Sequence, residues 1–128
     1  MTAGLIAFLR ARLDEDEVVA RAVGWDEVDA VDYLWGTRHL LLKRADESKA
    51  GAEMDASLAA HIARHDPARV LAEVEAKRRI VRAHEKWCEG RCEAKYPEGG
   101  FDAAHYWSVK SLAAAYADHP DYREEWRP

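Results

Sequence analysis

Hydrophobic side chains recur every three or four positions along residues 3–23, the spacing of one face of an α-helix. The stripe consists of Leu5, Leu9, Leu13, Ala20 and Val23. Thr2 can cap the start of this helix, and Gly24 can end it. Most of the acidic run 14–17 is expected to face solvent, whereas Asp16 falls on the hydrophobic stripe itself.

Residues 25–53 fit two different patterns. Alternating hydrophobic residues on either side of a potential turn at Gly36-Thr37 predict a β-hairpin insertion at about 28–43. These residues are Val31, Tyr33, Trp35, Leu40 and Leu42. A helical stripe is the alternative, formed by Val28, Val31, Trp35, Leu42 and Ala45. Residues 45–51 are small and polar and predict a loop or a frayed helix end.

Two helices are predicted in the middle of the chain. Residues 55–65 carry the apolar surface of a short helix. Asp66-Pro67 then begins a new helix, because aspartate accepts hydrogen bonds from the first backbone N–H groups and proline is tolerated at the first helical position. This helix is expected to run to about Cys88. Its stripe consists of Val70, Val74, Lys77, Val81, His84 and Cys88.

A loop rich in glycine and proline is predicted at 89–102, followed by a last helix at about 102–117 with Asp102 as its cap. The inward side of this helix consists of Tyr106, Val109, Leu112, Ala113 and Tyr116. His119-Pro120 ends it. Tyr122 and Trp126 of the tail are expected to pack back onto the helices. The prediction is a mainly α fold: one small four-helix domain over 1–128, with the hairpin at 28–43 left open.

Composition supports a folded protein, because 48% of the 128 residues are hydrophobic and 34% are charged. No apolar run approaches the roughly 20 residues of a membrane span. Arg10 and Arg12 end the N-terminal apolar run too early for a signal peptide, so we expect a cytoplasmic location and no membrane partner. The net charge is −5, and the basic cluster at 77–82 is interleaved with glutamates. A solvated helix face explains that cluster, and nucleic acid is an unlikely partner.

Three segments carry a family resemblance: FLRARLDEDE (8–17), HIARHDPARVLAEVEAKRR (61–79) and YADHPDYREEW (116–126). The chain resembles a family of small actinobacterial and actinophage proteins that is known only as a domain of unknown function. The resemblance implies no activity. It does imply a comparison of cysteines, since members often carry a cysteine pair after the central helix and another cysteine before the last helix. Here the later place lies near His105.

The first candidate site is a zinc site. His84, Cys88 and Cys92 are spaced four and four, so they share one face if the helix continues. Imidazole nitrogen and thiolate sulfur are ligands that zinc prefers, and His105 across the loop is the nearest fourth ligand. The alternative is that Cys88 is a small core residue, Cys92 a loop thiol and His84 a hydrogen-bonded histidine.

The second candidate is a metal site between helices. His61 and His65 stand four apart on one helical face, and Asp16 of the first helix could complete their ligand set. In the alternative interpretation His65 interacts with the C-terminal end of its helix and Asp66 is only a cap.

The third candidate is a partner-binding surface in the aromatic C-terminal half, at Trp107, Tyr122 and Trp126, since Trp and Tyr concentrate at interaction hot spots. Ordinary core packing is the alternative. No enzyme signature is present. The hypotheses are therefore a non-enzymatic interaction or regulatory protein, with another protein or a second copy as its partner, and a metal-binding protein with zinc as the candidate ion. A metal-dependent hydrolase at the histidine pair has no direct support.

Overall fold

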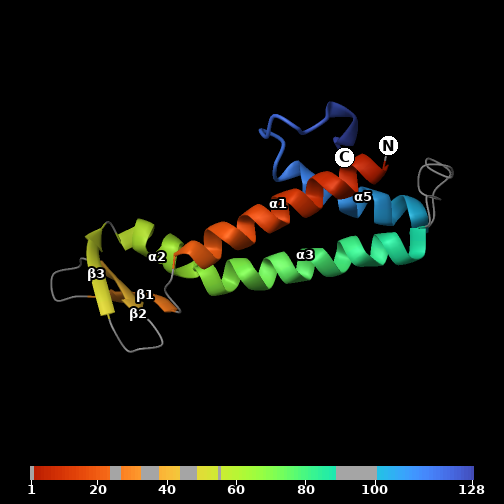
Figure 1. Ribbon diagram of the computed structural model, residues 1–128. Coiled ribbons are helices and arrows are strands. Elements are labelled where there is room, and N and C mark those ends of the chain that lie inside the picture. The colour runs from red at the N-terminus through yellow and green to blue at the C-terminus, as the bar shows by residue number, and fades with distance from the viewer. Residues whose placement is uncertain (1, 24–26, 33–37, 44–48, 55, 89–100) are drawn as a thin grey trace. The chain divides into compact units, whose positions relative to one another are not determined.

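The computed structural model describes residues 2–23, 27–32, 38–43, 49–54, 56–88 and 101–128 (Figure 1). These residues form four α-helices, three short strands and one 3₁₀ turn, which confirms the predicted mainly α fold. The helices are α1 (Thr2–Ala22), α2 (Ala56–Arg64), α3 (Pro67–Cys88) and α5 (Phe101–Ala114). The strands are β1 (Glu27–Asp32), β2 (Arg38–Lys43) and β3 (Lys49–Met54), and the 3₁₀ turn η1 covers Glu124–Trp126.

The chain divides into two compact units. Unit 1 contains residues 1–15 and 75–128, and unit 2 contains residues 16–74. The division passes through α1 and α3, so each of these helices contributes one part to each unit. The prediction of a single domain over 1–128 stays a prediction.

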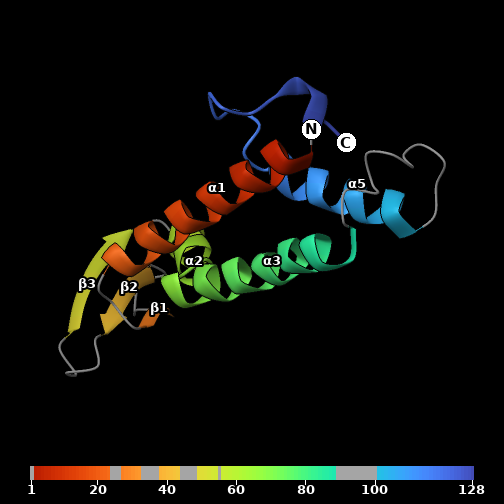
Figure 2. The same ribbon diagram turned by 45° about the vertical axis from the view of Figure 1, so that its right-hand side comes forward.

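Unit 2 contains an antiparallel sheet in the order β1-β2-β3 (Figure 2). β1 pairs with β2 from Glu27 opposite Lys43 to Asp32 opposite Arg38, which confirms the predicted hairpin. The helical alternative for this segment is wrong. Tyr33, Trp35 and the predicted turn at Gly36-Thr37 lie outside the described residues.

The third strand was not predicted. β3 pairs antiparallel with β2, from Lys49 opposite Lys43 to Met54 opposite Arg38. The prediction of a loop or frayed helix end is therefore wrong for 49–51. Alanine and glycine in this strand have little β propensity of their own, but β2 offers an edge whose backbone groups need partners. Helix α2 lies against β1 and β2.

The start of α3 follows the predicted capping chemistry. The Arg69 backbone N–H donates to Oδ1 of Asp66 over 2.9 Å, and the Val70 N–H donates to the Asp66 carbonyl over 3.0 Å. Asp66 is thus the N-cap and Pro67 the first helical residue. α3 ends at Cys88, as its hydrophobic pattern predicts.

Unit 1 has its core along the first half of α1, where Leu5, Leu9 and Leu13 are fully buried. The other buried hydrophobic residues described in this unit are Ile6, Phe8, Val81, Val109, Ala113 and Trp126.

Helix α5 begins at Phe101 and ends at Ala114, three residues before the predicted end. The residues after α5 form tighter turns, with hydrogen bonds between residues three positions apart. In one of these turns the Tyr116 N–H donates to the Ala113 carbonyl over 2.9 Å.

Helix α1 begins at Thr2 and α5 at Phe101. The capping roles predicted for Thr2 and Asp102 depend on side chains that lie outside the described residues, so they stay predictions. No helix in the described part of the chain is long and apolar enough to cross a membrane.

Candidate functional site

An open apolar groove lies within unit 2, where the last turns of α1, the end of α2 and the start of α3 come together. Its volume is about 450 Å³. We call it the unit 2 groove; it is lined by Asp16, Val19, Ala20, Val23, Ile62, His65, Asp66, Pro67 and Val70. Six of these nine residues are hydrophobic, and the polar ones are two carboxylates and one imidazole.

The apolar lining of the groove is exposed to solvent. Val19 is 69% exposed, Val23 43% and Ile62 38%. The prediction that Val23 continues the buried stripe of α1 is wrong, because the residue lies just beyond the end of the helix at Ala22, on an open groove. Contiguous exposed apolar side chains with a polar edge are typical of interaction sites. The arrangement can bind an apolar group, and the nine residues of the lining include no serine, threonine, cysteine or lysine.

The structure brings together only part of the second candidate metal site, which consists of Asp16, His61 and His65. The rings of His61 and His65 lie 4.6 Å apart, and Asp16 lines the groove together with His65. His61 does not line it. Among the described residues, no group of three or more histidine, cysteine, aspartate or glutamate side chains is close enough to hold a metal ion.

The two histidines of the predicted zinc site meet in unit 1. The rings of His84 and His105 stack with their centroids 5.1 Å apart and an interplanar angle of 17°. His84 is buried and His105 half-buried. The side chain of Cys88 and the whole of Cys92 lie outside the description, so the thiolate half of the predicted ligand set remains a prediction.

The aromatic candidates lie in different environments. Trp126 is buried against Phe8, with ring centroids 5.1 Å apart, and Tyr122 lies 5.9 Å from the same ring. The predicted packing of the tail is therefore present. Trp107 is exposed and lies under the ammonium of Lys110, which is 5.4 Å from its ring.

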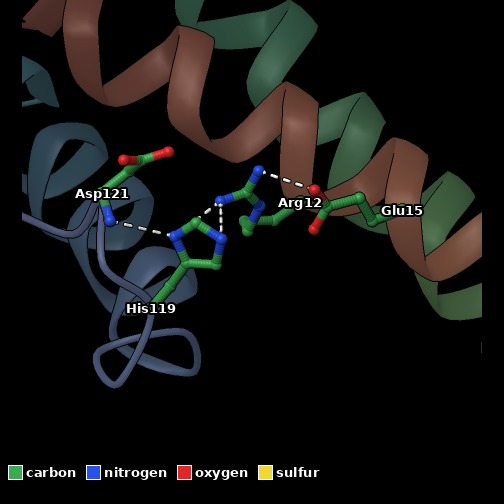
Figure 3. Close-up of polar contacts among 4 residues, drawn as sticks. All are labelled: Arg12, Glu15, His119 and Asp121. Atoms are coloured by element: carbon green, nitrogen blue, oxygen red, sulfur yellow. Dashed lines mark hydrogen bonds and ion pairs between the residues drawn. The ribbon is translucent and has the colours of Figure 1, made fainter.

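A polar cluster in unit 1 escaped the sequence-based prediction. Arg12 of α1 donates from Nη2 to Glu15 over 2.8 Å, and its Nη1 contacts Nδ1 of His119 at 2.7 Å and also Nε2 (Figure 3). The Asp121 backbone N–H donates to the same Nδ1 over 3.1 Å. Arg12 and His119 both lie in segments that carry the family resemblance, 8–17 and 116–126, but nothing in the sequence indicated that the two segments meet.

Comparison with known proteins gives one match. The model of DUF6221, a family of unknown function, matches residues 2–128. No curated protein and no solved structure matches the chain significantly.

Proposed function

The chain belongs to DUF6221, a family of unknown function, and on that premise we propose that it is a non-enzymatic binding protein that holds a basic, amphipathic helical segment of another protein in the unit 2 groove. Action in the cytoplasm and an actinobacterial or actinophage origin, both expected from the sequence, are part of the proposal.

The open groove is the observation that carries the proposal. Val19, Val23 and Ile62 are each more than a third exposed, and all three line this one groove. Burying such a surface against a partner releases about 25 cal/mol for each Å² of apolar area. An amphipathic helix that places residues i, i+4 and i+7 in a groove is a common way to do this.

The charge at the edge of the groove decides the kind of partner. Asp16 and Asp66 line it, and the whole chain has a net charge of −5. Lysine or arginine beside the apolar residues of the partner would meet these carboxylates, whereas acidic residues would be repelled. A second copy of this acidic chain is a less suitable occupant for the same reason.

A synthetic peptide provides the test. The probe is an amphipathic helical peptide with leucine at positions i, i+4 and i+7 and lysine on its flanks. The control peptide carries glutamate in place of lysine. Binding is measured by calorimetry, and the site is located from methyl NMR signals of Val19, Val23 and Ile62. We expect the lysine peptide to bind with one-to-one stoichiometry and the glutamate peptide to bind at least about tenfold more weakly.

Two adjacent valines of α1 form a matched pair of variants. Val19 lines the groove and Val18 does not, although Val18 is 67% exposed and thus equally accessible. Val19→Glu should weaken peptide binding at least about tenfold, and Val18→Glu less than about twofold. Equal effects of the two variants would show that the groove is not the site. Dimerisation of the wild type that Val19→Glu abolishes would identify a second copy as the occupant and overturn the proposed partner.

Metal binding at His84 and His105 is a second candidate function, and the proximity of the two rings, with centroids 5.1 Å apart, is the observation that supports it. One ring would have to turn out of the stacked arrangement for both nitrogens to bind one ion, because the lone pair of an imidazole nitrogen lies in the ring plane. Zinc would require two further ligands, and Cys88 and Cys92 are the predicted ones. The test is elemental mass spectrometry of protein purified without chelator or nickel resin. About one equivalent of zinc, lost in a Cys88→Ser, Cys92→Ser double variant together with several kcal/mol of stability, is the expected result. Metal-free protein with unchanged stability in the double variant would refute it.

A further inference from the structure

A second pocket lies in unit 1, between the first turns of α1 and the C-terminal tail. Its volume is about 550 Å³. We call it the unit 1 pocket; it is lined by Gly4, Ala7, Phe8, Ala11, Arg12, Pro120, Asp121, Tyr122, Arg123 and Trp126. In contrast to the unit 2 groove, its lining combines three aromatic rings with two guanidinium groups. From this pocket we infer a binding site for a small organic anion, a carboxylate or phosphate carried on a planar ring.

Arg12 provides the first argument, because it is a cation held below the surface. Only 8% of the residue is exposed, and its guanidinium carbon lies 5.2 Å from the centre of the Phe8 ring. Its Nη atoms are hydrogen-bonded to Glu15 and His119, but the buried Nε has no hydrogen-bond acceptor. A buried donor without an acceptor is uncommon in folded proteins and calls for an explanation.

Trp126 provides a second, independent donor of the same kind. The residue is 3% exposed, and its Nε1 is also buried without a hydrogen-bond acceptor. Both atoms are N–H donors, and both residues line the unit 1 pocket. Neighbouring atoms cover both donors, so a ligand oxygen that displaces this cover would satisfy groups for which the described residues supply no acceptor.

Arg123 supplies an exposed positive charge in the lining of the pocket. Its side chain is 61% exposed, lies 5.5 Å over the Trp126 ring and is 3.7 Å from Glu125, too long for a strong ion pair. Asp121 is the one carboxylate in the lining, against the two arginines. Because Glu15 already pairs with Arg12, Arg123 is the lining cation that remains for an anionic ligand.

The size and the rings of the pocket narrow the ligand class. Cavities of roughly 300–1,000 Å³ hold small organic ligands, so the pocket is larger than an inorganic anion requires. Phe8, Tyr122 and Trp126 offer ring faces and edges for a planar group, and the two arginines offer charge-assisted hydrogen bonds to oxygen. This inference does not depend on the unit 2 groove, because the two sites share no residue.

Four probes test the inference by NMR titration of the Trp126 indole N–H and the Arg12 Nε–H: phenylacetate, phenylacetamide, AMP and inorganic phosphate. Phenylacetamide is the neutral match of phenylacetate. We expect saturable shifts of both N–H signals with phenylacetate, AMP or both, and none with phenylacetamide. A response to phenylacetate alone assigns a carboxylate ligand, and a response to AMP alone assigns a phosphate ligand. Equal responses to phenylacetate and phenylacetamide, a response to inorganic phosphate alone, or no response would overturn the inference.

Exposed arginines of the tail supply matched variants that preserve the core. Arg123→Gln should weaken binding of the responding probe about tenfold, whereas Arg127→Gln should change it less than about twofold, because Arg127 does not line the pocket. Trp126→Phe keeps an aromatic ring and removes the indole N–H, and it should also weaken binding about tenfold. If Arg127→Gln weakens binding as much as Arg123→Gln, the effect is one of net charge and the inferred site is wrong.

Discussion

The two halves of helix α1 present hydrophobic side chains to different surroundings. In the first half, Leu5, Leu9 and Leu13 are fully buried, and Phe8 is covered by rings from the C-terminal tail. In the second half, Val18 and Val19 are exposed. One continuous helix therefore contains a closed part, which the chain covers itself, and an open part. The difference indicates that the first half serves stability and that the second half is available to a partner.

Replacing Phe8 is the most severe test of this comparison. Phe8→Ala removes a ring that contacts Tyr116, His119, Tyr122 and Trp126, and should lower the free energy of unfolding by about 3–5 kcal/mol. Urea denaturation followed by circular dichroism measures the loss. Val18→Ala in the open half is the control and should change stability by less than about 0.5 kcal/mol. Similar losses in the two variants would contradict the distinction between the halves.

The contact of His119 with Arg12 tests the polar part of the closed half. His119→Ala removes an acceptor from a guanidinium that is largely buried, so we expect a loss of about 1–3 kcal/mol. Thermal unfolding monitored by calorimetry is the appropriate measurement. His61→Ala, at an exposed histidine of α2, is the control and should have little effect. An unchanged stability of His119→Ala would mean that the tail is held by its aromatic rings alone.

The cap at Asp66 is a local interaction at the edge of the open groove. Asp66→Ala leaves the Arg69 backbone N–H without its acceptor and should cost about 1 kcal/mol. Asp66→Asn keeps a capping oxygen and removes the charge, so it should preserve most of the stability. The same pair of variants separates capping from partner binding. The lysine peptide should bind more weakly to both, since both lack the carboxylate that lines the groove.

The smallest effect is expected at Glu75, on the surface of α3. The hydrogen bond and charge of Arg82, together with the charges of Arg79 and Arg78, lower the pKa of the Glu75 carboxyl below its usual value of 4.5. A carboxyl whose pKa is lower in the folded state than in the unfolded state stabilises the fold at pH values above its unfolded-state pKa. This contribution is lost as the pH falls through its folded-state pKa. Glu75→Gln should therefore lower the melting temperature slightly at pH 7, with no difference from the wild type in strong acid. A difference that persists in acid would assign the effect to something other than this charge.

The sequence predicted contacts that join neighbouring elements better than contacts that join the ends of the chain. His84 and His105 were expected to meet because they flank one loop, and their rings do stack. Arg12 and His119 are 107 positions apart, and no local pattern connects them. Phe8 lies three positions after Leu5, so helical periodicity places it on the same side of α1 as the buried leucines, but periodicity does not show which rings it contacts. The thiolates of the predicted zinc site and the partner of the groove stay predictions.

The sequence by itself determined the positions of the helices and the start of α3, because helical periodicity and the cap at Asp66-Pro67 depend on residues within a few positions of one another. It also offered the hairpin, whose strands are close in the chain, as one of two patterns for residues 28–43. Tertiary structure decided the rest. β3 forms because β2 offers it an edge, although its own residues have little preference for a strand. Burial along α1 was decided in the same way, since a hydrophobic stripe does not show which part of it the chain will cover. Phe8 is covered by the ring of Trp126, a residue more than a hundred positions away, and such a contact cannot be derived from local periodicity.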